Sequence, residues 1–159
     1  MSEPLAIYLH DHLAGSTMAI DLLASMRKEH AGEPLGEFAA NLQVEIEADR
    51  DVLRTLIERV GAGSNAIKDL GAWMSEKVSR IKLGGQSGGD LTTFEALEFL
   101  MLGIHGKWAL WRALAVVAAK DPRLQGTDFS HLMARAGTQE IHVEQRRIEV
   151  ARTAFLPAE

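Results

Sequence analysis

Apolar residues recur every three or four positions over most of this chain, which is the spacing of one face of an α-helix. Five stretches carry the pattern, and glycine and proline residues separate them. No stretch alternates apolar and polar residues over the length that a half-buried strand needs. We therefore predict an all-α protein with helices at about 4–30, 35–60, 65–83, 92–119 and 127–155.

Local signals define the ends of these helices. Pro4 lies in the first turn of the first helix, and the residues at 31–34, Ala-Gly-Glu-Pro, separate that helix from the second. Residues 92–95, Thr-Thr-Phe-Glu, have the spacing of a capping box, so a helix is expected to begin at Thr92. Thr127 is the expected N-cap of the last helix.

The lengths of the connections constrain the topology. The first two long helices are joined by a few residues, and so are the last two, so each pair is predicted to form an antiparallel hairpin. About thirty residues, 61–90, connect the two hairpins. A connection of that length can return along the whole bundle, which would make the helices at 35–60 and 92–119 parallel. The short helix at 65–83 would then cross one end or flank of the bundle.

The composition indicates a single globular domain over residues 1–159. At 47% apolar residues, a chain of this length can bury a core without disulfides or zinc. The net charge of −5 argues against a protein that binds nucleic acid by neutralising phosphates. The longest apolar run, 113–119, is too short for a membrane span, and the first residues lack the basic region of a signal peptide. We therefore expect a cytoplasmic protein that binds neither nucleic acid nor a membrane.

Two further classes of site are excluded by residue type. The chain has no cysteine, which rules out thiol catalysis, iron–sulfur clusters and cysteine-ligated zinc. The glycine-rich residues 84–89 follow a predicted helix rather than a strand, and they lack the lysine of a phosphate-binding loop. No organic cofactor is predicted, and no substrate can be named.

Polar side chains interrupt the apolar stripes of all four long helices when residues are placed at 100° intervals. On the helix at 92–119, the expected inward stripe is Phe94, Met101 and Trp108. Three polar residues spaced seven apart line up with it, namely Glu98, His105 and Arg112. The inward polar residues of the four helices are His12, Glu45, Asp49, Glu98, His105, Gln139, Glu140 and His142. By contrast His10, His30 and His131 lie off the stripes and are expected at the surface.

Carboxylates inside an apolar bundle need a compensating cation, because desolvation of an unpaired charge costs several kcal/mol. A metal ion bound by the inward residues could supply the charge. Three arginines that touch the same stripes, Arg112, Arg146 and Arg147, could supply it instead. The residues themselves leave both possibilities open.

With these residues in place, the chain resembles the ferritin-like superfamily of bacterial four-helix proteins over nearly its whole length. In the two-metal members, two helices each give one Glu and the other two each give Glu-x-x-His. Here His12 stands where the first Glu is expected, and Glu45 follows it by 33 residues, with Ala48 at the histidine position. The last helix reads Gln139-x-x-His142, so its histidine is present and its glutamate is replaced.

The resemblance implies a ferritin-like bundle of uncharacterised function that binds an iron, manganese or zinc ion at mid-bundle. A metal-handling or stress-related role would follow by analogy. The alternative is a metal-free helical interaction or structural module with a buried network of histidine, carboxylate and arginine.

The helix at 92–119 is apolar on almost every side, since Phe99, Leu100, Leu110 and Val117 lie behind its expected inward stripe. One core-facing side does not need that much apolar surface. Either the short helix or a second subunit should cover it, and we expect a homodimer.

Overall fold

The computed structural model describes residues 3–61 and 89–158. Its helices are α1 (Pro4–Glu29), α2 (Pro34–Val60), α4 (Gly89–Ala118) and α5 (Phe129–Phe155), with the short 3₁₀ helix η2 (Pro122–Leu124) between the last two. The described residues contain no strand, which confirms the all-α prediction for them. Within these ranges, no helix combines the length and apolar character needed to cross a membrane.

Two helices begin elsewhere than the sequence indicated. Helix α4 begins at Gly89 rather than Thr92, and Thr93 lies inside it, where its hydroxyl donates a hydrogen bond to the Gly89 carbonyl (3.4 Å). Helix α5 is capped by Asp128 instead of Thr127, because the Asp128 carboxylate accepts a hydrogen bond from the His131 amide (3.0 Å). Asp and Thr are both good N-caps, so residue type alone could not decide between neighbours.

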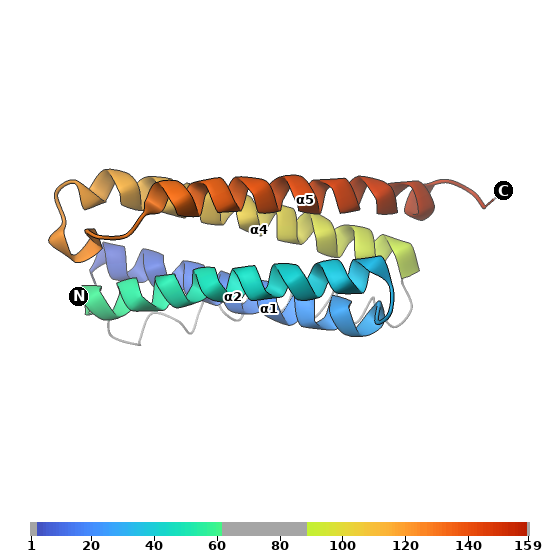
Figure 1. The fold of residues 1–159 in the computed structure, drawn as a ribbon, viewed down its shortest axis with the longest axis horizontal. Coiled ribbons are helices and arrows are strands. Elements are labelled where there is room, and N and C mark those ends of the chain that lie inside the picture. Colours follow the sequence, from blue (N-terminus) through green and yellow to red (C-terminus); the bar gives the residue numbers. More distant parts are fainter. Residues whose placement is uncertain (1–2, 62–88, 159) are drawn as a thin grey trace.

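The helices form two antiparallel hairpins stacked in two layers (Figure 1). Helix α1 packs mainly on α2, and α4 packs mainly on α5. Helices α2 and α4 run in the same direction, as predicted from the long connection, because α2 ends at the end of the bundle opposite to the start of α4. The predicted helix at 65–83 lies outside the described residues.

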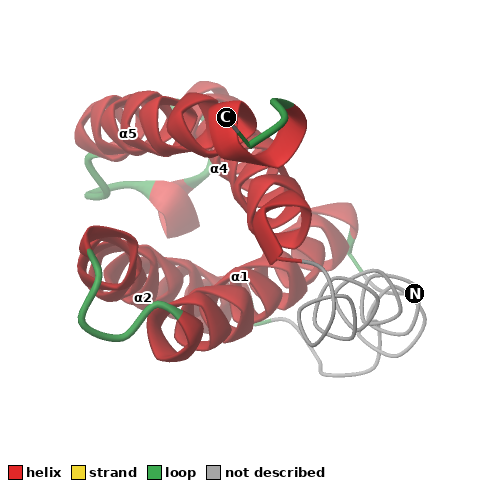
Figure 2. Ribbon diagram, turned by 90° about the vertical axis from the view of Figure 1, so that its right-hand side faces the viewer, coloured by secondary structure: helices red, strands yellow, loops and turns green. Residues whose placement is uncertain are grey.

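The two hairpins meet most closely through α1 and α4, whereas α2 and α5 lie farther apart (Figure 2). Two apolar clusters fill the interior. One includes Leu23, Leu42 and Leu97, and the other includes Leu56 and Trp111. The polar residues of the candidate site lie between these clusters along the bundle.

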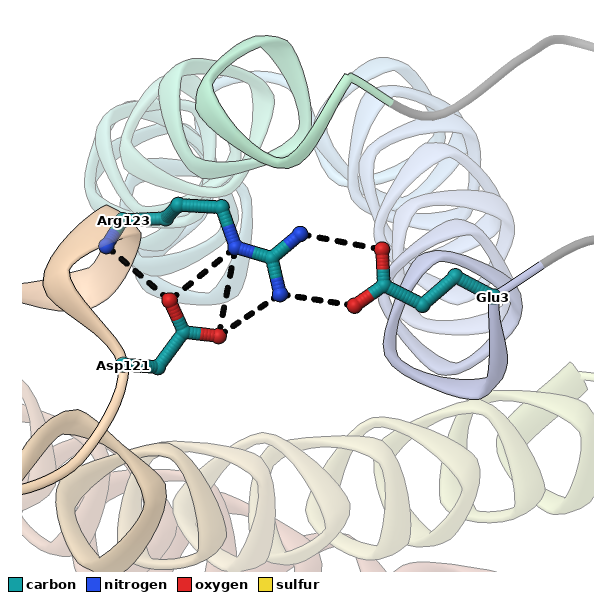
Figure 3. Close-up of polar contacts among 3 residues, drawn as sticks. All are labelled: Glu3, Asp121 and Arg123. Atoms are coloured by element: carbon teal, nitrogen blue, oxygen red, sulfur yellow. Dashed lines mark hydrogen bonds and ion pairs between the residues drawn. The ribbon is translucent and has the colours of Figure 1, made fainter.

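An arginine connects the α4–α5 turn to the beginning of α1 (Figure 3). The Arg123 guanidinium donates to both oxygens of Glu3 (2.6 and 2.9 Å) and to both oxygens of Asp121 (2.7 to 3.2 Å). The hydrogen bonds from Arg123 lower the pKa of Glu3 and the pKa of Asp121 below their ordinary values of 4.5 and 3.8. The second hairpin is thereby joined to the first at this end.

We predict that Arg123→Gln destabilises the protein at neutral pH and has little effect in acid. Carboxylates with a depressed pKa contribute stability that is present above their ordinary pKa and is lost as the pH falls through the folded-state pKa. Urea unfolding of both proteins between pH 7 and pH 3 measures the difference. The control is Arg54→Gln, which removes an exposed pair with Asp51 (3.7 Å). A destabilisation by Arg123→Gln that did not vary with pH would contradict this account.

Candidate functional site

A buried ion network joins the two hairpins at mid-bundle, and Asp49 is its central residue. The Asp49 side chain on α2 is only 3% exposed. One carboxylate oxygen accepts a hydrogen bond from the Lys107 ammonium of α4 (2.5 Å), and the other accepts one from the Arg135 guanidinium of α5. A single carboxylate of the first hairpin therefore holds two cations of the second.

Gln139 of α5 closes the network. Its side chain is 2% exposed, its amide oxygen accepts from Lys107 (2.5 Å), and its amide nitrogen donates to Glu45 (2.9 Å) and more weakly to Asp49 (3.5 Å). Both ends of the buried amide are thus paired, which removes most of the cost of burying it.

The charges of the network balance. Lys107 and Arg135 supply two positive charges, and Asp49 with the exposed Glu45 supplies two negative ones. Burial lowers the pKa of Lys107 below its ordinary value of 10.5, and the attraction of Asp49 opposes that shift only in part. Lys107 is therefore the cation whose charge the interior disfavours.

The position of the network follows from helical spacing. Asp49 lies three residues after Ile46 of the first apolar cluster and four residues before Leu53 of the second. Lys107 lies in the same way between Ile104 and Leu110 of α4. Residues three or four apart share one helical face, so the polar groups form a belt between two apolar clusters.

A cavity of about 320 Å³ lies beside the network, among α1, α2 and α4. Its walls are mainly apolar, and Asp49 and Lys107 contribute to them. Gly103 and Gly106 of α4 also line it, and a Cβ atom added to either would meet no atom of the described residues within 4 Å. Because glycine has no side chain, these two positions of α4 help to leave the space open.

His12 of α1 belongs to the same cavity wall. Its ring packs edge-on against Tyr8, with 4.7 Å between the ring centroids. Burial lowers the pKa of His12 below its ordinary value of 6.5, and the neighbouring Asp11 opposes that shift more weakly. At neutral pH the imidazole is therefore uncharged, with one donor and one acceptor nitrogen.

The eight residues predicted as metal ligands fall into separate groups. Glu45, Asp49 and Gln139 belong to the buried network, whereas Glu98 pairs with Arg147 (3.1 Å). His105 is 62% exposed and pairs with Glu140 (3.3 Å), and His142 is also exposed. His12 lies at the cavity. Over residues 3–61 and 89–158, no three His, Asp or Glu side chains are arranged to hold a metal ion.

As placed, these residues do not fit the metal centre that the ferritin-like resemblance implies. Both oxygens of Asp49 already accept hydrogen bonds from cations, so a metal ion at this carboxylate would have to displace Lys107 or Arg135 or lie against their positive charges. Gln139, which also contacts Asp49, is a neutral amide that is itself bonded at both ends. The metal centre stays a prediction.

The cations that balance Asp49 are not the expected arginines. Arg112 is exposed and lies over the Trp108 ring, and Arg146 lies over the Phe38 ring and pairs with Glu149. Arg147 pairs with Glu98 and Glu144. Only the general expectation of a buried carboxylate held by cations describes Asp49 correctly.

The reason is a rotation of α4 relative to its expected orientation. The fully buried side of α4 contains Leu97, Leu100 and Trp111 rather than the expected stripe of Phe94, Met101 and Trp108, which is only partly buried. Because α4 is apolar almost all round, its sequence does not define one inward side. One sequence signal could have identified Lys107 as an inward residue. It lies three residues after Ile104 and three residues before Leu110, which are both buried.

Two histidines expected at the surface are also placed differently. His10 is 7% exposed, and its two ring nitrogens have no hydrogen-bond partner within residues 3–61 and 89–158. His30 bonds to Glu33 (2.9 Å) and to Thr93 of α4 (3.3 Å), so it connects the α1–α2 turn to the other hairpin. His131 is exposed, as expected.

No protein-family model, no curated protein and no solved structure matches this chain. The resemblance to ferritin-like proteins therefore stays a prediction, and the functional argument depends on the chain's own residues.

We predict that Asp49→Asn destabilises the protein by about 3–5 kcal/mol, because it removes the negative charge to which both the largely buried Lys107 and the partly buried Arg135 are bonded. Thermal and urea unfolding, with chelator and with added Mn²⁺ or Fe²⁺, should give the same loss. The control is Asp51→Asn, which removes an exposed carboxylate of the same helix and should change stability by less than about 0.5 kcal/mol. An Asp49→Asn protein as stable as its parent without metal, with a smaller gain from added metal, would instead indicate a metal site.

Proposed function

We propose that this protein is a ferritin-like helical bundle that binds a small, mainly apolar molecule in the cavity among α1, α2 and α4. The cavity of about 320 Å³ is the observation that carries the proposal. The parallel course of α2 and α4, with two antiparallel hairpins, supports the ferritin-like part of it.

The size and the lining of the cavity support a ligand of this class. Pockets that bind small molecules have volumes from about 300 Å³, with apolar walls and a few polar groups that fix orientation. An apolar cavity of about 150 Å³ is sufficient to hold benzene, so a larger aromatic or a short aliphatic molecule suits this one. Phe99, Leu100, Ile104 and Leu110 supply apolar wall, and Tyr8 and Ser16 supply hydroxyl groups.

The polar wall favours an uncharged ligand. Asp49 and Lys107 are already paired with each other, so neither offers a free charge to a ligand. His12 is neutral because burial lowers its pKa. The Ser16 hydroxyl donates to the Leu13 carbonyl (2.7 Å), so towards a ligand its oxygen is an acceptor. A molecule with one hydroxyl or amide donor on an apolar body meets these conditions.

The site is built on helices that the buried network holds together, which keeps its walls in place before a ligand arrives. Lys107 belongs to both the cavity wall and the network, since its side chain lines the cavity while its ammonium bonds to Asp49 and Gln139. A preorganised pocket loses less conformational entropy on binding, which favours affinity.

We predict that Gly103→Leu weakens binding of a neutral fluorescent probe, N-phenyl-1-naphthylamine, by about tenfold or more, because the new side chain occupies the space of the ligand. The readout is the fluorescence of the probe titrated against the full chain. The matched control is Gly137→Leu on α5, where an added Cβ also meets no atom within 4 Å but does not face the cavity lining.

Both variants replace a helical glycine by leucine, so both gain helix propensity alike and their melting temperatures show that each is folded. The parent and Gly137→Leu should bind the probe equally. Equal binding by all three proteins, or no binding by the parent, would contradict the proposed function.

A further inference from the structure

The cavity has two walls of different character. On α1 its wall contains Tyr8, His12 and Ser16, which follow one another at intervals of four residues and therefore lie in one line along the helix. All three side chains can form hydrogen bonds. The wall on α4 is mainly apolar and includes Phe99 and Leu100. A bound molecule should therefore direct its polar group toward α1 and its apolar body toward α4.

The Ser16 hydroxyl offers an acceptor to this molecule. Its hydrogen is already donated to the Leu13 carbonyl (2.7 Å), so the Oγ atom has lone pairs to offer but no hydrogen. The Ser16 side chain consists only of Cβ and Oγ, so the oxygen lies at the wall wherever this side chain lines the cavity. A donor on the ligand would pair with it.

The His12 ring offers a donor one helical turn away. No side chain of residues 3–61 and 89–158 forms a hydrogen bond with this ring, which contacts Tyr8 edge-on. An imidazole has at least one N–H in either protonation state, so the donor is present at any pH. Residues four apart on a helix have Cβ atoms about 5–6 Å from each other, which places the His12 donor beside the Ser16 acceptor.

A hydroxyl group matches this pair with a single atom, because its oxygen accepts one hydrogen bond and donates another. A carbonyl or an ether oxygen only accepts, so it would leave the Ser16 oxygen without a donor. An amide both donates and accepts, but it takes two polar atoms out of water for the same two hydrogen bonds, which adds to the cost of desolvation. The pair therefore favours an alcohol.

The remaining lining favours an aromatic body for this alcohol. Tyr8 on α1, together with Phe99 and Trp111 on α4, brings aromatic rings to both walls. Aromatic rings in offset-stacked or edge-to-face contact attract each other by more than their buried area accounts for. A flat ring between the two helices can make such contacts on both sides.

We infer that the ligand of the cavity is an aromatic alcohol, whose hydroxyl accepts a hydrogen bond from His12 and donates one to Ser16 while its ring lies against α4. This inference rests on the proposed function and names the ligand class and the two residues that select it. The proposed function requires only an uncharged, mainly apolar ligand, so it stands even if the cavity does not distinguish a hydroxyl.

Displacement of bound N-phenyl-1-naphthylamine from the full chain by four small molecules tests the inference. The parent should bind 1-naphthol about fivefold more tightly than naphthalene, which has the same ring system without the hydroxyl. It should prefer 1-naphthol by a similar factor over 1-methoxynaphthalene, whose oxygen accepts but cannot donate. Decahydro-1-naphthol keeps the hydroxyl but has no aromatic ring, and it should also bind more weakly than 1-naphthol.

Two variants assign the preference to residues. Ser16→Ala and His12→Phe should each reduce the preference for 1-naphthol over naphthalene to about twofold or less, while naphthalene itself binds as it does to the parent. The matched control is Thr17→Ala. The Thr17 hydroxyl also donates to the Leu13 carbonyl (3.2 Å), but Thr17 is exposed and does not line the cavity, so this variant should keep the preference of the parent.

The outcomes separate this inference from the proposed function. If the parent binds naphthalene and 1-naphthol equally, or if the preference survives both Ser16→Ala and His12→Phe, the inference is overturned and the proposed function stands. Binding of decahydro-1-naphthol as tight as that of 1-naphthol would overturn the aromatic assignment. If neither the probe nor 1-naphthol binds to the parent, both the inference and the proposed function are contradicted.

Discussion

The Asp49 carboxylate is buried between two helical hairpins, and its charge is tolerated there only because each hairpin fixes the other's polar groups. Asp49 and Glu45 come from α2, whereas Lys107, Arg135 and Gln139 come from α4 and α5. Separating the hairpins would break every bond that Asp49 and Glu45 make to Lys107, Arg135 and Gln139 and would leave only the bond between Lys107 and Gln139. Because an unpaired buried charge costs several kcal/mol, a change of register that separated Asp49 from Lys107 and Arg135 would be costly.

The cavity is a consequence of the same arrangement. The Lys107 side chain lines the cavity, and its ammonium bonds to Asp49 and Gln139 in the ion network. Glycines on α4 leave the neighbouring space unfilled. The middle of the bundle is divided between an ion network whose charges are paired and a mainly apolar pocket, which is why we propose a neutral ligand for the pocket rather than a cation.

The sequence predicted the four long helices and their directions well, because glycine, proline and apolar spacing act locally and the connection lengths constrain the hairpins. It also placed Asp49 correctly, since α2 has one clear apolar stripe. It failed on α4, which is apolar on nearly every side, so nothing in its pattern distinguished Lys107 as inward or His105 as outward. The partners of Asp49 come from the other hairpin, and helical spacing within one element contains no information about such contacts.

The most direct test of the central role of this network is a double-mutant cycle between Asp49→Ala and Lys107→Ala, measured by urea unfolding. The account predicts that each single variant loses about 3–5 kcal/mol, and that the double variant loses clearly less than the sum, because Lys107 and Asp49 then no longer strand each other and only Arg135 is left without its partner. The Asp51→Ala and Lys107→Ala pair should be additive, since Asp51 is exposed on the same helix. Additive losses for Asp49 and Lys107 would show that the two hairpins do not depend on this ion pair, and would contradict the account.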